Sequence, residues 1–436
     1  MKMSSLLANN FNMSESLSES TITTFDSQRT TPTNQVTDEQ DKWLETCDLV
    51  GFKNEIEALG KELADNQGEA DEQHLHKMMM WNRSLQLLGL LTLGTFPNPF
   101  TVICLSLATF SRWTMIGHHV CHGGYDKVDK TGRFHRFRFA VGSLYRRLVD
   151  WLDWMLPEAW NIEHNKFHHY SLNEDADPDL VEENLEGLRS ANVPNFLKYL
   201  AFAFFMMTWK WFYYAPNTFS QMKLDEARRL GNEYPMKEGE RPYMTIMAFR
   251  NIPAWLNFSE LIFRVLMPYF VWQFILIPLP LYFLFGPTEY KYGMINLVLA
   301  EILTNVHSFI AVVTNHAGED LYRFSGKCRP RSEHFYLRQV IGSVDFDTGN
   351  DYIDFMHGFL SYQIEHHLYP ALSMLSYQRA QPRVKAICTK YGIPYRQENV
   401  FKRLKKTVDI MIGNAHMRPF PSAFEPQPEV DGETSS

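Results

Sequence analysis

Two apolar runs in the second half of the chain constrain its fold most strongly. Residues 261–286 read LIFRVLMPYFVWQFILIPLPLYFLFG, and residues 293–315 read GMINLVLAEILTNVHSFIAVVTN. As a helix, each run is long enough to cross the roughly 30 Å hydrocarbon core of a bilayer. The mean hydropathy of the chain is slightly negative only because polar ends and loops offset these runs. We therefore expect an integral membrane protein.

Two further apolar stretches lie upstream, at residues 85–96 and 99–117, on either side of a Pro-Asn-Pro turn. They predict a hairpin of two additional spans, so we expect about four transmembrane helices. A fifth stretch, residues 195–216, is crowded with Trp and Tyr but contains Lys198 and Lys210. Since aromatic and basic side chains favour the membrane surface, we interpret it as an interfacial helix.

Histidines gather in three short segments of the chain. Residues 117–124 read GHHVCHGG, residues 161–171 read NIEHNKFHHYS, and residues 362–370 read YQIEHHLYP, which together hold eight of the sixteen histidines. On a helix, positions four apart share a face, so His118 should point with His122, and His164 with His168, with His169 beside them. One such segment alone could be a solvated turn, but three together indicate a metal site, because neutral imidazole is the commonest metal ligand.

The basic residues predict on which side of the membrane this site lies. Seven of them follow the first hairpin, at Lys127, Lys130, Arg133, Arg136, Arg138, Arg146 and Arg147. The short turns at 96–99 and 287–292 together hold a single lysine. By the positive-inside rule, the histidine segments and both chain ends should face the cytosol, or the stroma of a plastid. An even number of spans then separates the second and third segments, as a single site requires.

The number of imidazoles predicts two metal ions, because seven from the three segments exceed what one tetrahedral zinc can use. His316, at the expected cytosolic end of the last span, adds an eighth, whereas His307 lies deeper and should be a packing or pocket residue. Cys121 falls off the face shared by His118 and His122, so no thiolate is expected and iron is favoured. The candidate ligands of two iron ions (Fe2+) are His118, His122, His164, His168, His169, His316, His366 and His367.

The remaining sequence divides simply. We expect a disordered polar tail at 1–38, a polar cytosolic segment with a helix at 39–79, a membrane domain at 80–410 and an unstructured tail at 411–436. The fold class is all-α, with a cytosolic helical cap holding the histidines. With a net charge of −8 and no phosphate-binding glycine loop, the chain gives no sign of a nucleic-acid partner.

The segments GHHVCH, HNKFHH and QIEHHLYP resemble the three histidine boxes of the membrane fatty acid desaturase superfamily. The resemblance covers about residues 80–410. It is greatest to acyl-lipid and front-end desaturases: SLNEDADPDL after the second box is similar to a segment of those enzymes, as are Gln363, where many relatives have a histidine, and the residues after the third box. Three features depart from those enzymes: the HxxxHH spacing of the second box, His119 where an Asp is usual, and the lack of the His-Pro-Gly-Gly motif of a fused cytochrome b5 domain. These departures leave the position of the new double bond open.

The resemblance implies an oxidoreductase that removes two hydrogens from an acyl chain of a membrane lipid, with O2 and a separate electron donor, either cytochrome b5 or ferredoxin. The seven basic residues could dock an acidic carrier, or could reflect topology and contact with anionic lipid. The endoplasmic reticulum is the expected membrane, with a plastid or bacterial-type inner membrane as alternatives. A membrane hydroxylase of acyl, sphingoid, sterol or carotenoid substrates would use the same boxes. A histidine-rich metal transporter would need ionisable groups inside its spans.

Overall fold

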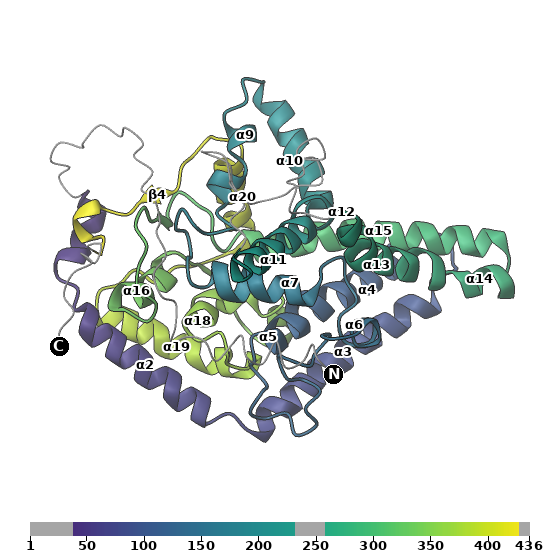
Figure 1. Ribbon diagram of the computed structural model, residues 1–436, viewed down its shortest axis with the longest axis horizontal. Helices are drawn as coiled ribbons and strands as arrows, with labels where there is room; N and C mark the ends of the chain where they lie inside the picture. The colour runs from purple at the N-terminus through teal and green to yellow at the C-terminus, as the bar shows by residue number, and fades with distance from the viewer. Residues whose placement is uncertain (1–37, 232–257, 427–436) are drawn as a thin grey trace.

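The computed structural model of the protein describes residues 38–231 and 258–426, and it is mostly helical, with 66% helix. The all-α prediction is thus confirmed in its coarse form. The apolar helices extend to one side of the molecule in Figure 1 and end at α14 and at the tip of α15, whereas α2, α16, α18 and α19 gather on the opposite side. The predicted N-terminal tail lies outside the described residues except for Asp38.

The polar segment predicted at 39–79 is helical and packs against helices of the C-terminal part of the chain. It contains η1 (Glu39–Glu45), α2 (Leu49–Asp65) and the start of α3 (Glu69–Leu91). The Asp48 carboxylate caps α2 by accepting a hydrogen bond from the Gly51 amide at 2.9 Å. The face of α2 that carries Phe52 and Ile56 is fully buried. This helix packs on α16 (Glu333–Ile341), which precedes the third histidine segment, and on α19 (Met374–Lys390), which follows it.

Three helices in the described residues are long and apolar enough to cross a membrane: Pro99–Cys121, Leu261–Leu284 and Pro287–Val313. The first comprises α4 (Pro99–Phe110), the π-helical η2 (Ser111–Gly117) and α5 (His118–Cys121). The second comprises η6 (Leu261–Leu266), α13 (Met267–Val271), η7 (Trp272–Leu276) and α14 (Leu279–Leu284), preceded by α12 (Phe258–Glu260), and the third is α15 (Pro287–Val313). The first half of the predicted hairpin is the end of α3, which packs on α4 but is not among the three.

The connection after the first long helix is made of short elements. They are α6 (Leu144–Asp150), α7 (Pro157–Ile162), the π-helical η3 (Glu163–His168), α8 (Val181–Asn184) and α9 (Glu186–Arg189). Pro157 stands at the start of α7, where its missing N–H leaves no helical hydrogen bond unmade.

The stretch at 195–216 forms a helix that is longer than expected. It comprises α10 (Asn195–Trp209), the π-helical η4 (Lys210–Tyr214) and α11 (Ala215–Arg229). Its two lysines are buried rather than exposed. Lys198 Nζ donates to the Arg189 carbonyl at 2.6 Å, and Lys210 Nζ lies 3.2 Å from a carboxylate oxygen of both Asp153 and Glu301. Because Glu301 belongs to α15, Lys210 joins this helix to the long apolar helices.

The C-terminal part, which we call the cap, consists of short helices and two pairs of two-residue parallel strands. The helices are α16 (Glu333–Ile341), α17 (Asp351–Met356), η8 (Leu360–Tyr362), α18 (Gln363–Leu368), α19 (Met374–Lys390), α20 (Val400–Met411) and η9 (Ser422–Phe424). Strand β1 (Tyr322–Arg323) pairs with β4 (Arg418–Pro419), and β2 (Asp345–Phe346) pairs with β3 (Gln397–Glu398).

The prediction of an unstructured tail at 411–436 is therefore wrong for residues 411–426. Met411 is the last residue of α20, β4 pairs with β1, and Met417 and Phe420 are buried in the core. The parallel strand partner supplies hydrogen bonds that the local sequence, rich in proline and polar residues, cannot provide by itself. Residues 427–436 lie outside the described part of the chain.

The buried ion cluster gives a prediction about stability. Replacing Lys210 by Met should destabilise the protein by about 3–5 kcal/mol, because two buried carboxylates would lose their cation. The apparent Tm in detergent micelles should fall by several degrees. Lys405→Met is the matched control, since Lys405 is 80% exposed in an ion pair with Asp409 and should leave the Tm unchanged. Equal Tm values for the two variants would contradict this account of the cluster.

Candidate metal centre

The eight histidines predicted as ligands lie together, although they come from four separate parts of the chain. His118 and His122 follow η2, His164 and His168 lie within η3 with His169 directly after it, His316 follows α15, and His366 and His367 follow η8. Their rings form one continuous set of contacts. All eight are buried, the most exposed being His316 at 9%.

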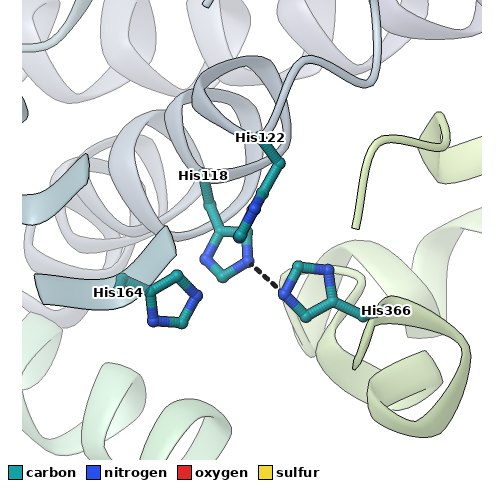
Figure 2. A group of neighbouring side chains, drawn as sticks. All are labelled: His118, His122, His164 and His366. Atoms are coloured by element: carbon teal, nitrogen blue, oxygen red, sulfur yellow. Dashed lines mark hydrogen bonds between the residues drawn. The ribbon is translucent and has the colours of Figure 1, made fainter. Parts of the chain in front are cut away.

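Seven of these side chains form two groups. Within each group, the nitrogens that could bind a metal ion all lie within 4.8 Å of one another. The first imidazole group is His118, His122, His164 and His366, drawn in Figure 2. The second imidazole group is His168, His316 and His367. The closest nitrogens are 3.0 Å apart in the first group, between the Nε2 atoms of His118 and His366. In the second they are 3.2 Å apart, between those of His367 and His316.

His169 lies between the two groups. Its Nε2 atom is 3.3 Å from His164 Nε2 and 3.1 Å from His366 Nε2, both in the first group. Its ring stacks on His367 of the second group with centroids 4.3 Å apart. The two groups are therefore parts of a single centre with two foci.

The π-helical turn η3 changes the pairing that the sequence predicts. An α-helix would point His164 and His168 to one place, and their rings do stack, with centroids 5.2 Å apart. However, the two belong to different groups. The His169 amide bonds to the His164 carbonyl at 3.1 Å, five residues back, so the wider turn brings His169 to His164 instead. Because of the extra residue in the π turn, one short segment places rings in both imidazole groups.

The chemistry of the donors fits a transition metal. Burial lowers the pKa of His122, His164 and His169 well below its ordinary value, and the neighbouring imidazoles lower it further. These rings are therefore neutral, with one N–H and one free lone pair each. Their nitrogens face other nitrogens, and His122 Nε2 has no hydrogen-bond partner among the described residues. A metal ion that prefers nitrogen ligands would give these lone pairs a partner.

Polar side chains outside the centre hold several rings in a fixed orientation. His168 Nδ1 lies 2.9 Å from Asp177 Oδ1, and His367 Nδ1 lies 3.0 Å from Gln339 Oε1. A ring that donates Nδ1–H outward keeps its Nε2 lone pair directed inward. Burial lowers the pKa of His168, but the Asp177 carboxylate outweighs it and raises the pKa above its ordinary value.

Two further polar residues beside the centre were not predicted as site residues. The hydroxyl of Tyr377 is 3.2 Å from His366 Nδ1, and the Gln363 amide is 2.8 Å from His316 Nε2. Gln363 lies within the third histidine segment, so its position in the sequence was a usable signal. Tyr377 lies in α19 and has no such signal.

A pair of acidic side chains also adjoins the first imidazole group. Glu163 and Asp179 lie with His164 in a third set of potential ligand atoms within 4.8 Å. Burial raises the pKa of Glu163 well above its ordinary value, and the charge of Asp179 adds to this. Burial likewise raises the pKa of Asp179 to about 6. Burial therefore disfavours the charged form of both carboxyl groups.

The other histidines near the centre have structural contacts. His119 Nδ1 is 2.6 Å from the Met115 carbonyl, one helical turn back. His307 stacks on Phe110 with centroids 3.9 Å apart and bonds to the Met356 carbonyl, which confirms it as a packing residue. Cys121 is buried outside all three sets of ligand atoms, as its sequence position predicts.

Comparison with known proteins gives a family match over most of the chain. The sequence model of the family described as "Fatty acid desaturase" matches residues 97–399, a range that contains all eight clustered histidines. No solved structure matches the chain.

Several curated proteins are similar to this chain at low identity. An "NADPH-dependent stearoyl-CoA 9-desaturase" of Mycobacterium tuberculosis is 22% identical over 385 residues, covering 84% of this chain and 79% of that protein. A "Delta 8-(E)-sphingolipid desaturase" of Candida albicans is 25% identical over 271 residues, covering 59% and 42%. An "Acyl-lipid (9-3)-desaturase" of Borago officinalis is 27% identical over 114 residues, covering 26% and 24%.

The contact between Gln339 and His367 gives a testable prediction. Replacing Gln339 by Leu removes the acceptor that orients the ring, and loss of such an outer partner typically lowers metal affinity about 10- to 100-fold. Iron retained during titration with a chelator measures the change. Gln73→Leu is the control, because Gln73 is exposed on α3 and its side chain donates to Glu69, four residues away. Iron retention equal to that of the control would show that Gln339 does not orient the ring.

Proposed function

The chain belongs to the fatty acid desaturase family, and we propose that it introduces a double bond into a fatty acyl chain of a membrane lipid, using O2 and two iron ions. The observation that carries the iron proposal is the convergence of eight buried imidazoles around two foci. Catalytic zinc sites use about three protein ligands and no redox chemistry, so this donor set suits iron better.

We propose that the two imidazole groups, with His169 between them, hold the irons, and that the Gln363 amide stands beside the second. Two irons held in this way would supply the oxidation, in which O2, two external electrons and two protons take up two hydrogens from adjacent methylenes and form two waters. The protein's own contribution is orientation of the ligands. Asp177 and Gln339 fix one ring each through its Nδ1 atom.

Aromatic side chains support the expectation that the reaction takes place away from water. Trp160 stacks on His164 with centroids 4.5 Å apart and contacts His122 at 5.4 Å. Trp151 contacts Trp160 in turn, and neither Trp exposes more than 1% of its surface. An apolar wall beside the ligands suits an acyl chain and excludes water that would compete for the reacting centre.

We propose that α3 completes four membrane spans, because Leu87, Leu88 and Leu91 near its end are exposed and apolar. The α10 helix carries a further exposed apolar row at Phe196, Leu200 and Phe204, which supports its placement at the membrane surface. With the histidines on the proposed cytosolic side of the membrane, the endoplasmic reticulum is the proposed location.

A separate electron carrier, cytochrome b5 or ferredoxin, is proposed to dock on the basic connection after the first long helix. Of the seven basic residues there, three are exposed: Lys127, Lys130 and Arg138. Arg133, Arg136 and Arg146 pair with Asp150 or Asp126, and Arg147 is buried. The three exposed charges are therefore the ones available to an acidic carrier. The Mycobacterium relative is named NADPH-dependent, which supports a reductase at the start of the electron path.

Expression in a yeast that makes no polyunsaturated lipids tests the function. New double bonds in the acyl chains of membrane lipids are the expected product, identified by mass spectrometry of the extracted lipids. His168→Ala should abolish the product, because it removes a ring from the second imidazole group. If the acyl chains are hydroxylated instead of unsaturated, the reaction is a hydroxylation and not the proposed desaturation. If the His168→Ala protein gives as much product as the wild type, the proposed site is wrong.

His316 tests the ligand set, because it is the only member outside the three histidine segments. Purified wild-type protein should contain about two irons per chain. His316→Gln keeps size and polarity but should bind less iron and give little product, while inserting into the membrane normally. Metal analysis of the purified protein and membrane fractionation measure these effects. A His316→Gln protein with two irons and full product yield would leave seven histidine ligands.

A further inference from the structure

A polar cavity of about 720 Å3 lies apart from the histidine cluster, and none of the eight clustered histidines lines it. It is open to the surface and is bordered by α3, α17, η8 and α19. The side chains that define its chemistry are Lys77, Trp81, Asp351, Asp354 and Gln378. The proposed reaction leaves these residues without a role.

With α3 as the proposed fourth span, the cavity would lie at the depth of the lipid head groups. Trp81 lies four residues, or about 6 Å along the helix axis, before Leu85. The apolar end of α3 begins at Leu85. The head-group layer is about 5–8 Å thick on each side of the hydrocarbon core. At the mouth of the cavity, Tyr352 is 67% exposed, and the adjacent Ile353 is 37% exposed. Exposed aromatic and aliphatic side chains of this kind are typical of the membrane surface.

The wall of the cavity carries charges of both signs, held in place. Lys77 Nζ lies 2.6 Å from Asp351 Oδ2 and 5.2 Å from the centre of the Trp81 ring. Gln378 Nε2 donates to Asp351 and to Asp354, at 2.8 Å in both cases. The Trp81 ring therefore already accepts a cation from the cavity side, next to a carboxylate.

This arrangement is complementary to a zwitterion. A phosphate could bind Lys77 and draw it away from Asp351 and Trp81, and the ligand's ammonium group could then take the place of the Lys77 ammonium against that carboxylate and ring. The two carboxylates and one lysine leave the cavity with a net negative charge. A coenzyme A thioester, which carries several phosphate charges, would be repelled there.

The cavity also adjoins the residues that hold the centre. Tyr362 lines the cavity, and the next residue, Gln363, contacts His316. Gln378 lines it too, and the preceding residue, Tyr377, contacts His366. A head group in the cavity would thus sit one layer of side chains from the second and first imidazole groups.

We propose that this cavity binds the zwitterionic head group of a phospholipid whose acyl chain is the substrate, so that the enzyme acts on intact lipid rather than on a coenzyme A thioester. This inference rests on the proposed function and names its substrate class. Lys77, Asp351 and Trp81 contact the head group, and none of them touches the histidine cluster.

Binding of short-chain probes to the purified full chain tests the proposal without turnover. The probes are dioctanoyl phosphatidylcholine, dioctanoyl phosphatidylglycerol and octanoyl coenzyme A, and calorimetric titration below their micelle concentrations gives each Kd. We expect the phosphatidylcholine probe to bind most tightly. Lys77→Gln and Asp351→Asn should each weaken its binding about three- to tenfold, an effect typical of one partly exposed charge. Lys405→Gln, which breaks an exposed ion pair elsewhere, should leave its binding unchanged.

The proposal is overturned if the coenzyme A probe binds most tightly, or if both variants bind the phosphatidylcholine probe as the wild type does. Lys77→Arg, which keeps the charge, should restore binding if Lys77→Gln loses it, and failure to do so would also count against the site. Iron content and Tm of each variant show that the protein is folded. If the probe binds as expected but the yeast makes no new double bonds, the proposed reaction fails while the binding site stands. If the yeast makes new double bonds, but the variants change neither the binding of the probe nor the class of lipid in which the double bonds occur, then the proposed head-group site is wrong and the proposed reaction stands.

Discussion

The constraint on which the structure depends is the burial of many neutral imidazoles with their nitrogens facing one another. A buried polar atom without a partner costs about 1–3 kcal/mol, so such a cluster persists only if acceptors outside it and an ion inside it satisfy the rings. Asp177, Gln339 and Tyr377 are the outer partners that the fold supplies, and they come from a loop, α16 and α19. The cap must therefore close over the ends of the long helices, and the buried face of α2 packs on the two helices that carry Gln339 and Tyr377.

The π-helical turns direct histidine rings from nearby positions in the sequence to different imidazole groups. The π-helical η2 leads directly into His118, and η3 contains His164 and His168. An α-helix repeats every 3.6 residues and would direct the last two to one point, whereas the wider turn assigns them to separate groups. The irregular backbone of these segments is thus explained by the number of ligands that each one has to supply.

The sequence predicted what depends on composition and spacing. The long apolar runs predicted the three helices that are long and apolar enough to cross a membrane. The position of His316 directly after the last run predicted that it lies beside the other histidines. The contact of His169 with His164 could not be predicted, because it follows from a π turn that no local pattern specifies. Gln339 meets its histidine across 28 residues, and Phe420 is buried through strand pairing with a segment about a hundred residues earlier. Such contacts depend on tertiary structure and leave no periodicity in the sequence.

The position of the centre relative to the long helices depends on charges buried between them. Lys210 bonds to Glu301 of α15, and in a medium of low dielectric this pairing is strong and specific in direction. It fixes how far the helix that begins at Asn195 lies along α15. Four residues later, the Tyr214 hydroxyl accepts a hydrogen bond from Trp160 Nε1 at 3.1 Å, and Trp160 stacks on His164. A contact inside the bundle of apolar helices therefore reaches the first imidazole group through two aromatic side chains, so the ion pair of Lys210 and Glu301 helps to position the metal centre relative to α15.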